Sequence, residues 1–173
     1  MKNNKILACL ADIIDNSYKN ETTSRFEEKS IGMMLPIDAS GCSFLSYSFD
    51  KHAVGAIPRN IPFFSSQKGV QSMCDYIVFS HNEGKLFILM IELKNSHQQT
   101  MPQLIAGKCL AKFIVDTCNR VNSMSLKPEY RLVSVCKSHF VKKGSTKMRD
   151  FEYDDKGFHC FEGKIFMLKE FLK

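Results

Sequence analysis

The chain opens with apolar residues at helical spacing: Ile6, Leu7, Leu10, Ile13, Ile14 and Tyr18. This spacing predicts an amphipathic helix over residues 3–18. After the polar residues 20–24, Ser24 stands three positions before Glu27, which is a capping-box pattern. It predicts a second short helix over residues 25–34, closed by Pro36.

Three apolar segments with the composition of β-strands follow, over residues 42–49, 73–80 and 85–93. The last two are separated by the four residues 81–84 (HNEG), which are typical of a hairpin turn. We therefore expect the second and third strands to pair in an antiparallel hairpin.

Helical spacing returns over residues 101–119, where Pro102 suits the first turn, and residues 130–136 have the composition of a strand. The pattern over residues 158–161 and 165–168 predicts a second small hairpin. The alternative is that the last of these segments is a helix. Helices combined with an antiparallel meander and one later crossover indicate an α/β or α+β layered domain. We expect one domain over residues 1–173, with its core at about 3–136 and a basic loop and tail over 137–173.

Composition places the chain among soluble globular proteins, because 44% of its residues are hydrophobic and 24% are charged. The net charge of +6 is compatible with a polyanionic partner. The seven cysteines are odd in number and widely spread, which favours reduced thiols over a disulfide framework. Asp12 and Asp15 interrupt the first apolar segment, and no apolar run approaches the length of a membrane span. We therefore expect a cytoplasmic protein that does not enter a membrane.

Charged residues stand at one end of the predicted hairpin. Glu92 and Lys94 end the apolar segment ILMIELK, and because side chains alternate along a strand they project to the same face. Folding the hairpin about residues 82–83 places Asp75 opposite Met90 or Ile91, so that its carboxylate falls beside that of Glu92. Charges at the end of an apolar strand must be paired, solvated or bound to a metal.

Two carboxylates and an intervening carbonyl oxygen, that of Leu93, form a hard oxygen site suited to Mg²⁺ or Mn²⁺. Such a metal can polarise a phosphate and lower the pKa of a bound water. Lys94 can orient that water or offset the charge that develops in the transition state. The alternative is that Glu92 and Lys94 are solvated where the strand ends and that Asp75 caps a loop.

The sequence contains Asp75, then a spacer of sixteen residues, then Glu92-Leu93-Lys94. This pattern resembles the motif of the PD-(D/E)XK nuclease superfamily, which includes restriction endonucleases and Holliday junction resolvases. The predicted element order is also similar to that family's core, so the resemblance implies a restriction-endonuclease-like fold: helix, three-stranded meander, helix and strand, with a mixed central sheet flanked by helices. It implies that Asp75 and Glu92 bind the metal and that Lys94 assists catalysis.

The resemblance also implies a further acid from the first helical unit, for which Glu28 and Glu27 are the candidates. It implies a glutamine at the start of the following helix, for which Gln103 is the first choice and Gln99 the second. The chain departs from the family pattern at Cys74, which replaces the proline. Gly107 stands where some members carry a tyrosine.

By this resemblance the chain is expected to be a Mg²⁺- or Mn²⁺-dependent endonuclease that acts on DNA, with RNA left open, in restriction, phage defence or repair. A homodimer or a larger nuclease complex is the implied assembly. Two alternatives remain: a catalytically silent nucleic-acid-binding or interaction module on the same fold, and a nuclease subunit that needs a partner.

Basic residues gather over 137–149, where the sequence holds five of them and no acid. They can follow a phosphate backbone, and the candidates are Lys142, Lys143, Lys147 and Arg149. A solvated loop balanced by the acidic residues of 150–155 explains the same pattern equally well. Arg59 and Lys68, in the connection that precedes the hairpin, are a second candidate DNA-facing pair.

Overall fold

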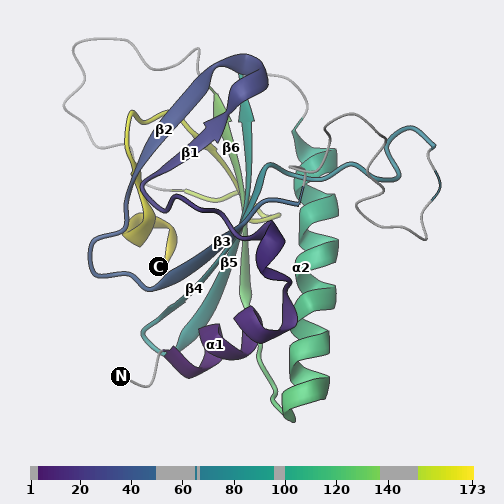
Figure 1. Cartoon of the computed structure of the whole chain (residues 1–173). Coiled ribbons are helices and arrows are strands. Elements are labelled where there is room, and N and C mark those ends of the chain that lie inside the picture. The colour runs from purple at the N-terminus through teal and green to yellow at the C-terminus, as the bar shows by residue number, and fades with distance from the viewer. Residues whose placement is uncertain (1–3, 50–64, 66, 96–99, 137–151) are drawn as a thin grey trace.

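A computed structural model describes residues 4–49, 65, 67–95, 100–136 and 152–173 of the chain. Its larger sheet has five strands in the order β3-β4-β5-β6-β7 (Figure 1). The first three pair antiparallel and the last two are added in parallel, so the sheet is mixed as predicted. The strands are β3 (Phe44–Tyr47), β4 (Tyr76–Asn82), β5 (Lys85–Lys94), β6 (Glu129–Cys136) and β7 (Phe158–Phe161).

Two helices, α1 (Asn4–Ile13) and α2 (Met101–Asn122), pack on one face of this sheet. The predicted helix over 3–18 is shorter in the structure. It stops because the Asp15 carboxylate accepts a hydrogen bond from the Ser17 amide at 2.8 Å and starts a separate 3₁₀ turn, η1 (Asn16–Tyr18). The second helix extends slightly beyond its predicted end. Among the described residues, no helix has both the length and the apolar character needed to cross a membrane.

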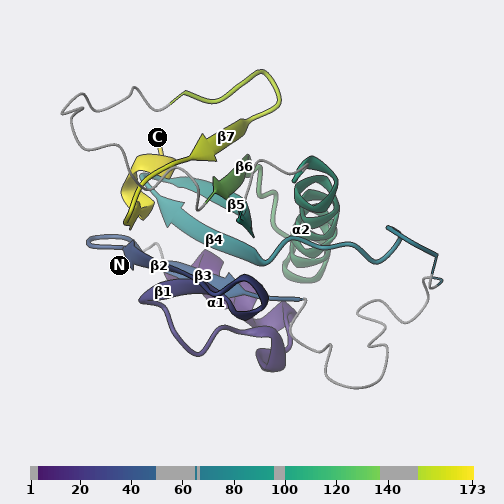
Figure 2. The same cartoon turned by 90° about the horizontal axis from the view of Figure 1, so that it is seen from above.

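A second sheet, rather than more helices, packs on the opposite face. It contains β1 (Arg25–Glu28), β2 (Met33–Asp38) and β8 (Phe166–Met167). Figures 1 and 2 show the β1–β2 hairpin and α2 on opposite sides of the five-stranded sheet. The domain is therefore a layered α+β structure in which the helices flank the central sheet on one face and the second sheet covers the other.

The predicted helix over residues 25–34 is wrong. This segment forms β1, the 3₁₀ turn η2 (Lys29–Ile31) and the start of β2, which together make a hairpin with η2 at its tip. Burial alternates along β2, with Met33 and Leu35 buried and Met34 exposed, as a strand packed on one face requires. Gly32 follows η2 with a φ of +57° and turns the chain into β2. The capping-box pattern of Ser24 and Glu27 therefore did not decide the structure of this segment; the burial of alternate side chains did.

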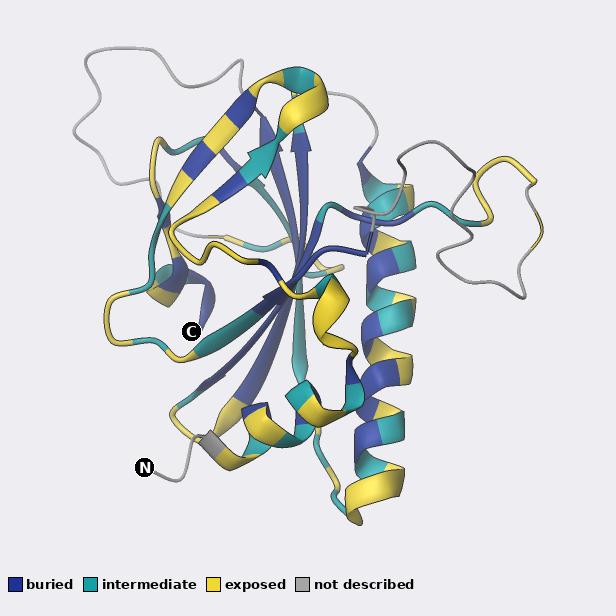
Figure 3. Cartoon of the chain, in the orientation of Figure 1, coloured by how far each residue is buried: buried dark blue, intermediate teal, exposed yellow. Residues whose placement is uncertain are grey.

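The central strands β4 and β5 are buried on both faces, and Figure 3 shows both almost entirely in the colour of buried residues. Alternate side chains enter the two cores: Ile77 and Met90 face the helices, whereas Val78 and Leu89 face the second sheet. Double-sided burial explains why these strands are continuous apolar runs in the sequence.

The hairpin turn consists of Glu83 and Gly84, whose φ values of +50° and +83° are those of a tight two-residue turn. Asn82 pairs with Lys85 and Tyr76 pairs with Ile91. The next position along the strand therefore places Asp75 across from Glu92, rather than across from Met90 or Ile91 as the predicted turn would have it.

The C-terminal segments do not form a hairpin, which was one of the two predicted alternatives; the other was a helix in the last segment. β7 adds to β6 in the larger sheet, whereas β8 adds to β2 in the smaller one and leads into η4 (Leu168–Phe171). The rings of Phe166 and Phe171 stack at 4.0 Å between centroids, and Phe166 packs edge-on against Phe26. Burial of these aromatic rings under the second sheet separates the two segments.

Gly107 of α2 packs closely against Cys74 and against Met90 of β5. A Cβ atom here would overlap Cys74 Sγ and would approach Met90 Cγ at 3.1 Å. We expect Gly107→Ala to destabilise the protein by about 1–3 kcal/mol through overpacking, although alanine normally favours a helix. Chemical denaturation measures the loss. The double variant Cys74→Ala/Gly107→Ala should regain much of it, and independent, additive losses would contradict this packing.

Candidate active site

The end of the β4–β5 hairpin positions three charged side chains. Asp75 immediately precedes β4, while Glu92 and Lys94 lie near the end of β5. Leu93, between them, packs into the core under the second sheet. Strand alternation therefore directs Glu92 and Lys94 to the other side of β5, the side that carries Met90 and α2.

Hydrogen bonds connect these residues into one unit. The Leu93 amide donates to Asp75 Oδ2 at 2.6 Å, and the Asp75 amide donates to Glu92 Oε2 at 3.2 Å. Lys94 Nζ lies 2.7 Å from Glu92 Oε1. Glu92 is only 2% exposed, so its carboxyl group lies at the buried base of the site.

The electrostatics reflect this crowding of carboxylates. Burial, with a further contribution from the charge of Glu92, raises the pKa of Asp75 to about 7, and Glu28 adds to the effect. Burial alone would lower the pKa of Lys94. Its hydrogen bond to Glu92 and the surrounding carboxylates outweigh that and raise the pKa of Lys94. The ammonium therefore stays protonated at neutral pH, while Asp75 is poised to gain or lose a proton.

A cavity of about 290 Å³ opens over these side chains. Four separate segments line it: the β1–η2 hairpin, the residues before β4, the end of β5 and the first turn of α2. The lining residues are Glu28, Ser30, Ile31, Gln71, Ser72, Met73, Asp75, Glu92, Leu93, Lys94 and Gln103. The structure thus brings Asp75, Glu92, Lys94 and Gln103 together with one of the two candidate glutamates.

Glu28, and not Glu27, is the glutamate at the cavity. Its carboxylate accepts a hydrogen bond from the Ser30 amide at 2.9 Å, which fixes it at the start of η2. Glu27 is the preceding residue of β1, and its carboxylate lies 3.4 Å from Arg25 Nη2 instead. The two glutamates therefore form a matched pair, one inside the cavity and one outside.

If Glu28 contributes to cation binding, Glu28→Gln should weaken Mn²⁺ affinity by roughly 10-fold, whereas Glu27→Gln should leave it unchanged. Isothermal titration calorimetry with Mn²⁺ measures both. Equal affinities in the two variants would exclude Glu28 from the site.

Gln103 lies in the first turn of α2, and its side-chain oxygen is buried without a hydrogen-bond partner in the described part of the chain. A buried acceptor of this kind normally finds a partner. Its place in the cavity lining makes it available to a water or a ligand. Gln99, the second choice, lies outside the described residues.

None of the basic candidates is among the described residues that line the cavity. Arg59, Lys142, Lys143, Lys147 and Arg149 lie outside them. Lys68 is exposed in the turn before β4 and is not among the lining residues.

Sequence reasoning missed the polar lining supplied by Ser30, Gln71 and Ser72. It also missed Tyr76, whose hydroxyl contacts the Glu27 backbone. No local pattern marks these residues. Ser30 lies in the segment predicted as a helix, and Gln71 and Ser72 lie in the connection before the predicted strand. The contact of Tyr76 is with Glu27, 49 positions away in the sequence.

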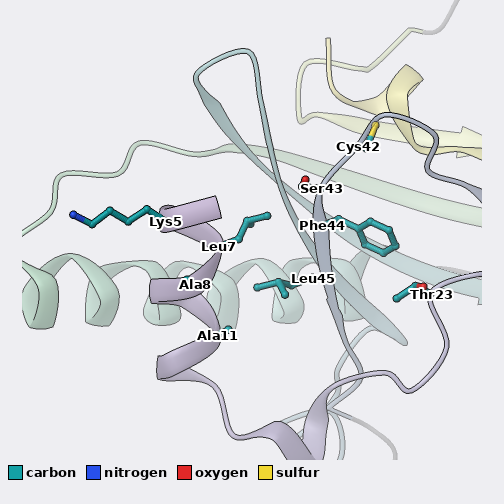
Figure 4. Close-up of a pocket in the computed structure, with 9 residues that line it drawn as sticks. All are labelled: Lys5, Leu7, Ala8, Ala11, Thr23, Cys42, Ser43, Phe44 and Leu45. Carbon is teal, nitrogen blue, oxygen red and sulfur yellow. The ribbon is translucent and has the colours of Figure 1, made fainter. Parts of the chain in front are cut away.

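A second, larger hollow of about 820 Å³ lies between α1 and β3 (Figure 4). Leu7 of α1 and Leu45 of β3 belong to the same core there, whereas the ring of Phe44 points to the other side of β3. Lys5 supplies the charged group of the described lining, which includes no carboxylate. This hollow offers no ligand set for a cation. Of the two, the smaller cavity is the one whose described lining contains carboxylates.

The donor set of the smaller cavity fits a hard divalent cation. Asp75 and Glu92 supply carboxylate oxygens, and Leu93, whose carbonyl is the third candidate ligand, is also a lining residue. No group of three acidic, histidine or cysteine side chains encloses a metal position by itself within the described ranges. Mg²⁺ is usually bound by one or two carboxylates and keeps several waters, so the two carboxylates of Asp75 and Glu92 are an adequate protein ligand set.

Comparisons of this chain with known protein families, with curated proteins and with solved structures found no match. The function proposed for it therefore depends on the cavity and its charged residues.

Proposed function

We propose that this protein is a divalent-metal-dependent nuclease that hydrolyses phosphodiester bonds of DNA. The observation that carries the proposal is the hydrogen-bonded unit of Asp75, Glu92 and Lys94 at one cavity. Two crowded carboxylates beside an ammonium form a costly arrangement in a folded protein unless a cation or an anionic ligand uses it.

The element order supports the same proposal. After α1 and the β1–β2 hairpin come the β3–β4–β5 meander, the crossover helix α2 and the parallel strand β6. Apart from that hairpin, this order resembles the restriction-endonuclease-like core of the PD-(D/E)XK superfamily, with the charged residues where the second meander strand begins and the third ends.

In the proposed mechanism, Asp75, Glu92 and the Leu93 carbonyl hold Mg²⁺ or Mn²⁺. The metal, when bound, polarises the scissile phosphate and lowers the pKa of a water. Lys94, kept protonated by its carboxylate neighbours, binds a non-bridging phosphate oxygen and offsets charge that develops there. The unpartnered oxygen of Gln103 accepts a hydrogen bond from the attacking water and orients it.

The net charge of +6 supports a nucleic acid as the partner, because basic surfaces attract the phosphate backbone. We propose that it acts as an endonuclease in restriction, phage defence or repair, as a homodimer or within a larger nuclease complex. We propose the cytoplasm as its location.

Purified protein should cleave supercoiled plasmid in the presence of Mg²⁺ or Mn²⁺, and EDTA should abolish cleavage because the oxygen ligands alone cannot activate water. Agarose gels that follow nicked and linear products measure this. Linear duplex DNA, single-stranded DNA and RNA tested in parallel assign the substrate. Salt-sensitive DNA binding without cleavage in any metal would contradict the nuclease and favour the silent binding module. Cleavage only with cell extract would indicate a subunit that needs a partner.

A further inference from the structure

Tyr76 connects the two sheets directly beside the proposed metal site. It is buried, with 5% of its surface exposed. Its hydroxyl donates a hydrogen bond to the Glu27 carbonyl at 2.7 Å and accepts one from the Glu27 amide at 2.8 Å. A single side chain of β4 thus satisfies both backbone groups of one residue in β1.

This double contact has a clear structural reason. β1 is the edge strand of the smaller sheet, paired on one side with β2. Edge strands leave backbone N–H and C=O groups without a strand partner. The Tyr76 hydroxyl takes the place of that partner at Glu27, and the ring of Phe26 packs on the Tyr76 ring at 4.7 Å between centroids.

The residues next to this contact carry the carboxylates of the cavity. Asp75 precedes Tyr76 and Glu28 follows Glu27, and both line the same space. Glu28 and Asp75 carry the same charge, so their approach is unfavourable when no cation lies between them. A fixed link between β1 and β4 opposes this repulsion and keeps Glu28 at the cavity.

We propose that Tyr76 is a positioning residue of this site, which holds Glu28 at the cavity lined by Asp75 and Glu92 so that its carboxylate contributes, as a third one, to divalent-cation binding. This role rests on the proposed function, since it presumes that the cavity binds a metal. Tyr76 itself contacts no reacting atom and acts through Glu28.

The test compares Tyr76→Phe with Tyr47→Phe. Tyr47 is a fully buried tyrosine of the same sheet whose hydroxyl has no hydrogen-bond partner among the described residues, so it reports the general effect of removing a buried phenol oxygen. Isothermal titration calorimetry with Mn²⁺ should show a loss of affinity of roughly 10-fold in Tyr76→Phe, the size found for groups that orient metal ligands, and none in Tyr47→Phe.

A double-mutant cycle with Glu28→Gln separates positioning from a general structural effect. If Tyr76 acts through Glu28, Tyr76→Phe should weaken Mn²⁺ binding in the wild-type background and have no further effect in Glu28→Gln. An equal loss in both backgrounds overturns the proposal. Amide hydrogen exchange gives a second measurement, because the Glu27 amide should exchange faster in Tyr76→Phe; unchanged protection there also overturns it.

The two proposals fail in different ways. A wild-type protein that binds no Mn²⁺ overturns the metal site and this role of Tyr76 together. A wild-type protein that binds Mn²⁺ with the same affinity as Tyr76→Phe overturns the role of Tyr76 alone.

Discussion

Glu92→Gln is expected to lower Mg²⁺-dependent DNA cleavage by at least about 100-fold, the size of effect seen when one group that stabilises a transition state is removed. Glu92 is 2% exposed and accepts from both the Asp75 amide and Lys94, so its carboxylate is the fixed centre of the site. Glutamine keeps the shape of the side chain but removes the charge. Initial rates of plasmid nicking measure the loss, and Mn²⁺ affinity should fall with the rate.

Lys94→Met should lower the cleavage rate to the same extent as Glu92→Gln. It should nevertheless leave the Mn²⁺ affinity unchanged or increase it. The reason is that Lys94 Nζ lies 2.7 Å from Glu92 Oε1, where it competes with a cation for the carboxylate. Opposite effects on rate and affinity distinguish a catalytic ammonium from a structural one.

Two variants serve as matched controls. Glu27→Gln changes a glutamate outside the cavity lining, and Lys112→Met removes an exposed lysine of α2 that pairs with Asp116 at 2.6 Å. Both should cleave DNA like the wild type, since surface ion pairs contribute little. Wild-type rates in Glu92→Gln or Lys94→Met would rule out the assignment of the site.

Asp75→Asn is expected to stabilise the metal-free protein at pH 8, while it abolishes metal-dependent cleavage. The pKa of Asp75 is about 7 in the folded protein, chiefly because of burial, against an ordinary value of 3.8. Asparagine keeps an oxygen that can accept from the Leu93 amide, and it carries no charge. The gain in unfolding free energy should be about 2–4 kcal/mol above pH 7.

The sign of the pH dependence follows from the direction of this shift. Between about pH 4 and pH 7, folded Asp75 retains a proton that the unfolded chain has released. The contribution of Asp75 therefore lowers stability as pH rises through this window, and the full penalty is present above pH 7. Below pH 4 the carboxyl is protonated in both states, so the wild type and Asp75→Asn should be equally stable there.

Urea denaturation of both proteins at pH 4, 6 and 8 measures this difference. Addition of Mg²⁺ at pH 8 should stabilise the wild type and not the variant, because a bound cation compensates the buried charge. A variant that is less stable than the wild type at pH 8 would contradict the raised pKa of Asp75.

Much of the site could be predicted because its central residues lie on one hairpin. Glu92 and Lys94 are two positions apart on a strand, and their common orientation follows from strand geometry alone. Asp75 was placed near them by the hairpin, although the position of the turn at Glu83 and Gly84 changed its partner to Glu92.

The remaining residues were not predictable in this way. Residues 25–34 carry helix-capping signals and contain too few residues to establish a periodicity, and their strand structure depends on the burial of Phe26, Met33 and Leu35 against the larger sheet. Glu28 and Tyr76 meet because β1 packs there.

The sequence by itself determined the identity of the charged residues, their common strand face and the order of the main elements, since these depend on periodicities of two and 3.6 residues within single segments. Only the tertiary structure decided that a second sheet covers the far face, that Glu28 rather than Glu27 reaches the cavity, and that the Tyr76 hydroxyl joins the two sheets there. Those outcomes depend on contacts between residues far apart in the sequence, such as Glu27 with Tyr76 and Ile37 with Phe166, and burial in a shared core decides such contacts.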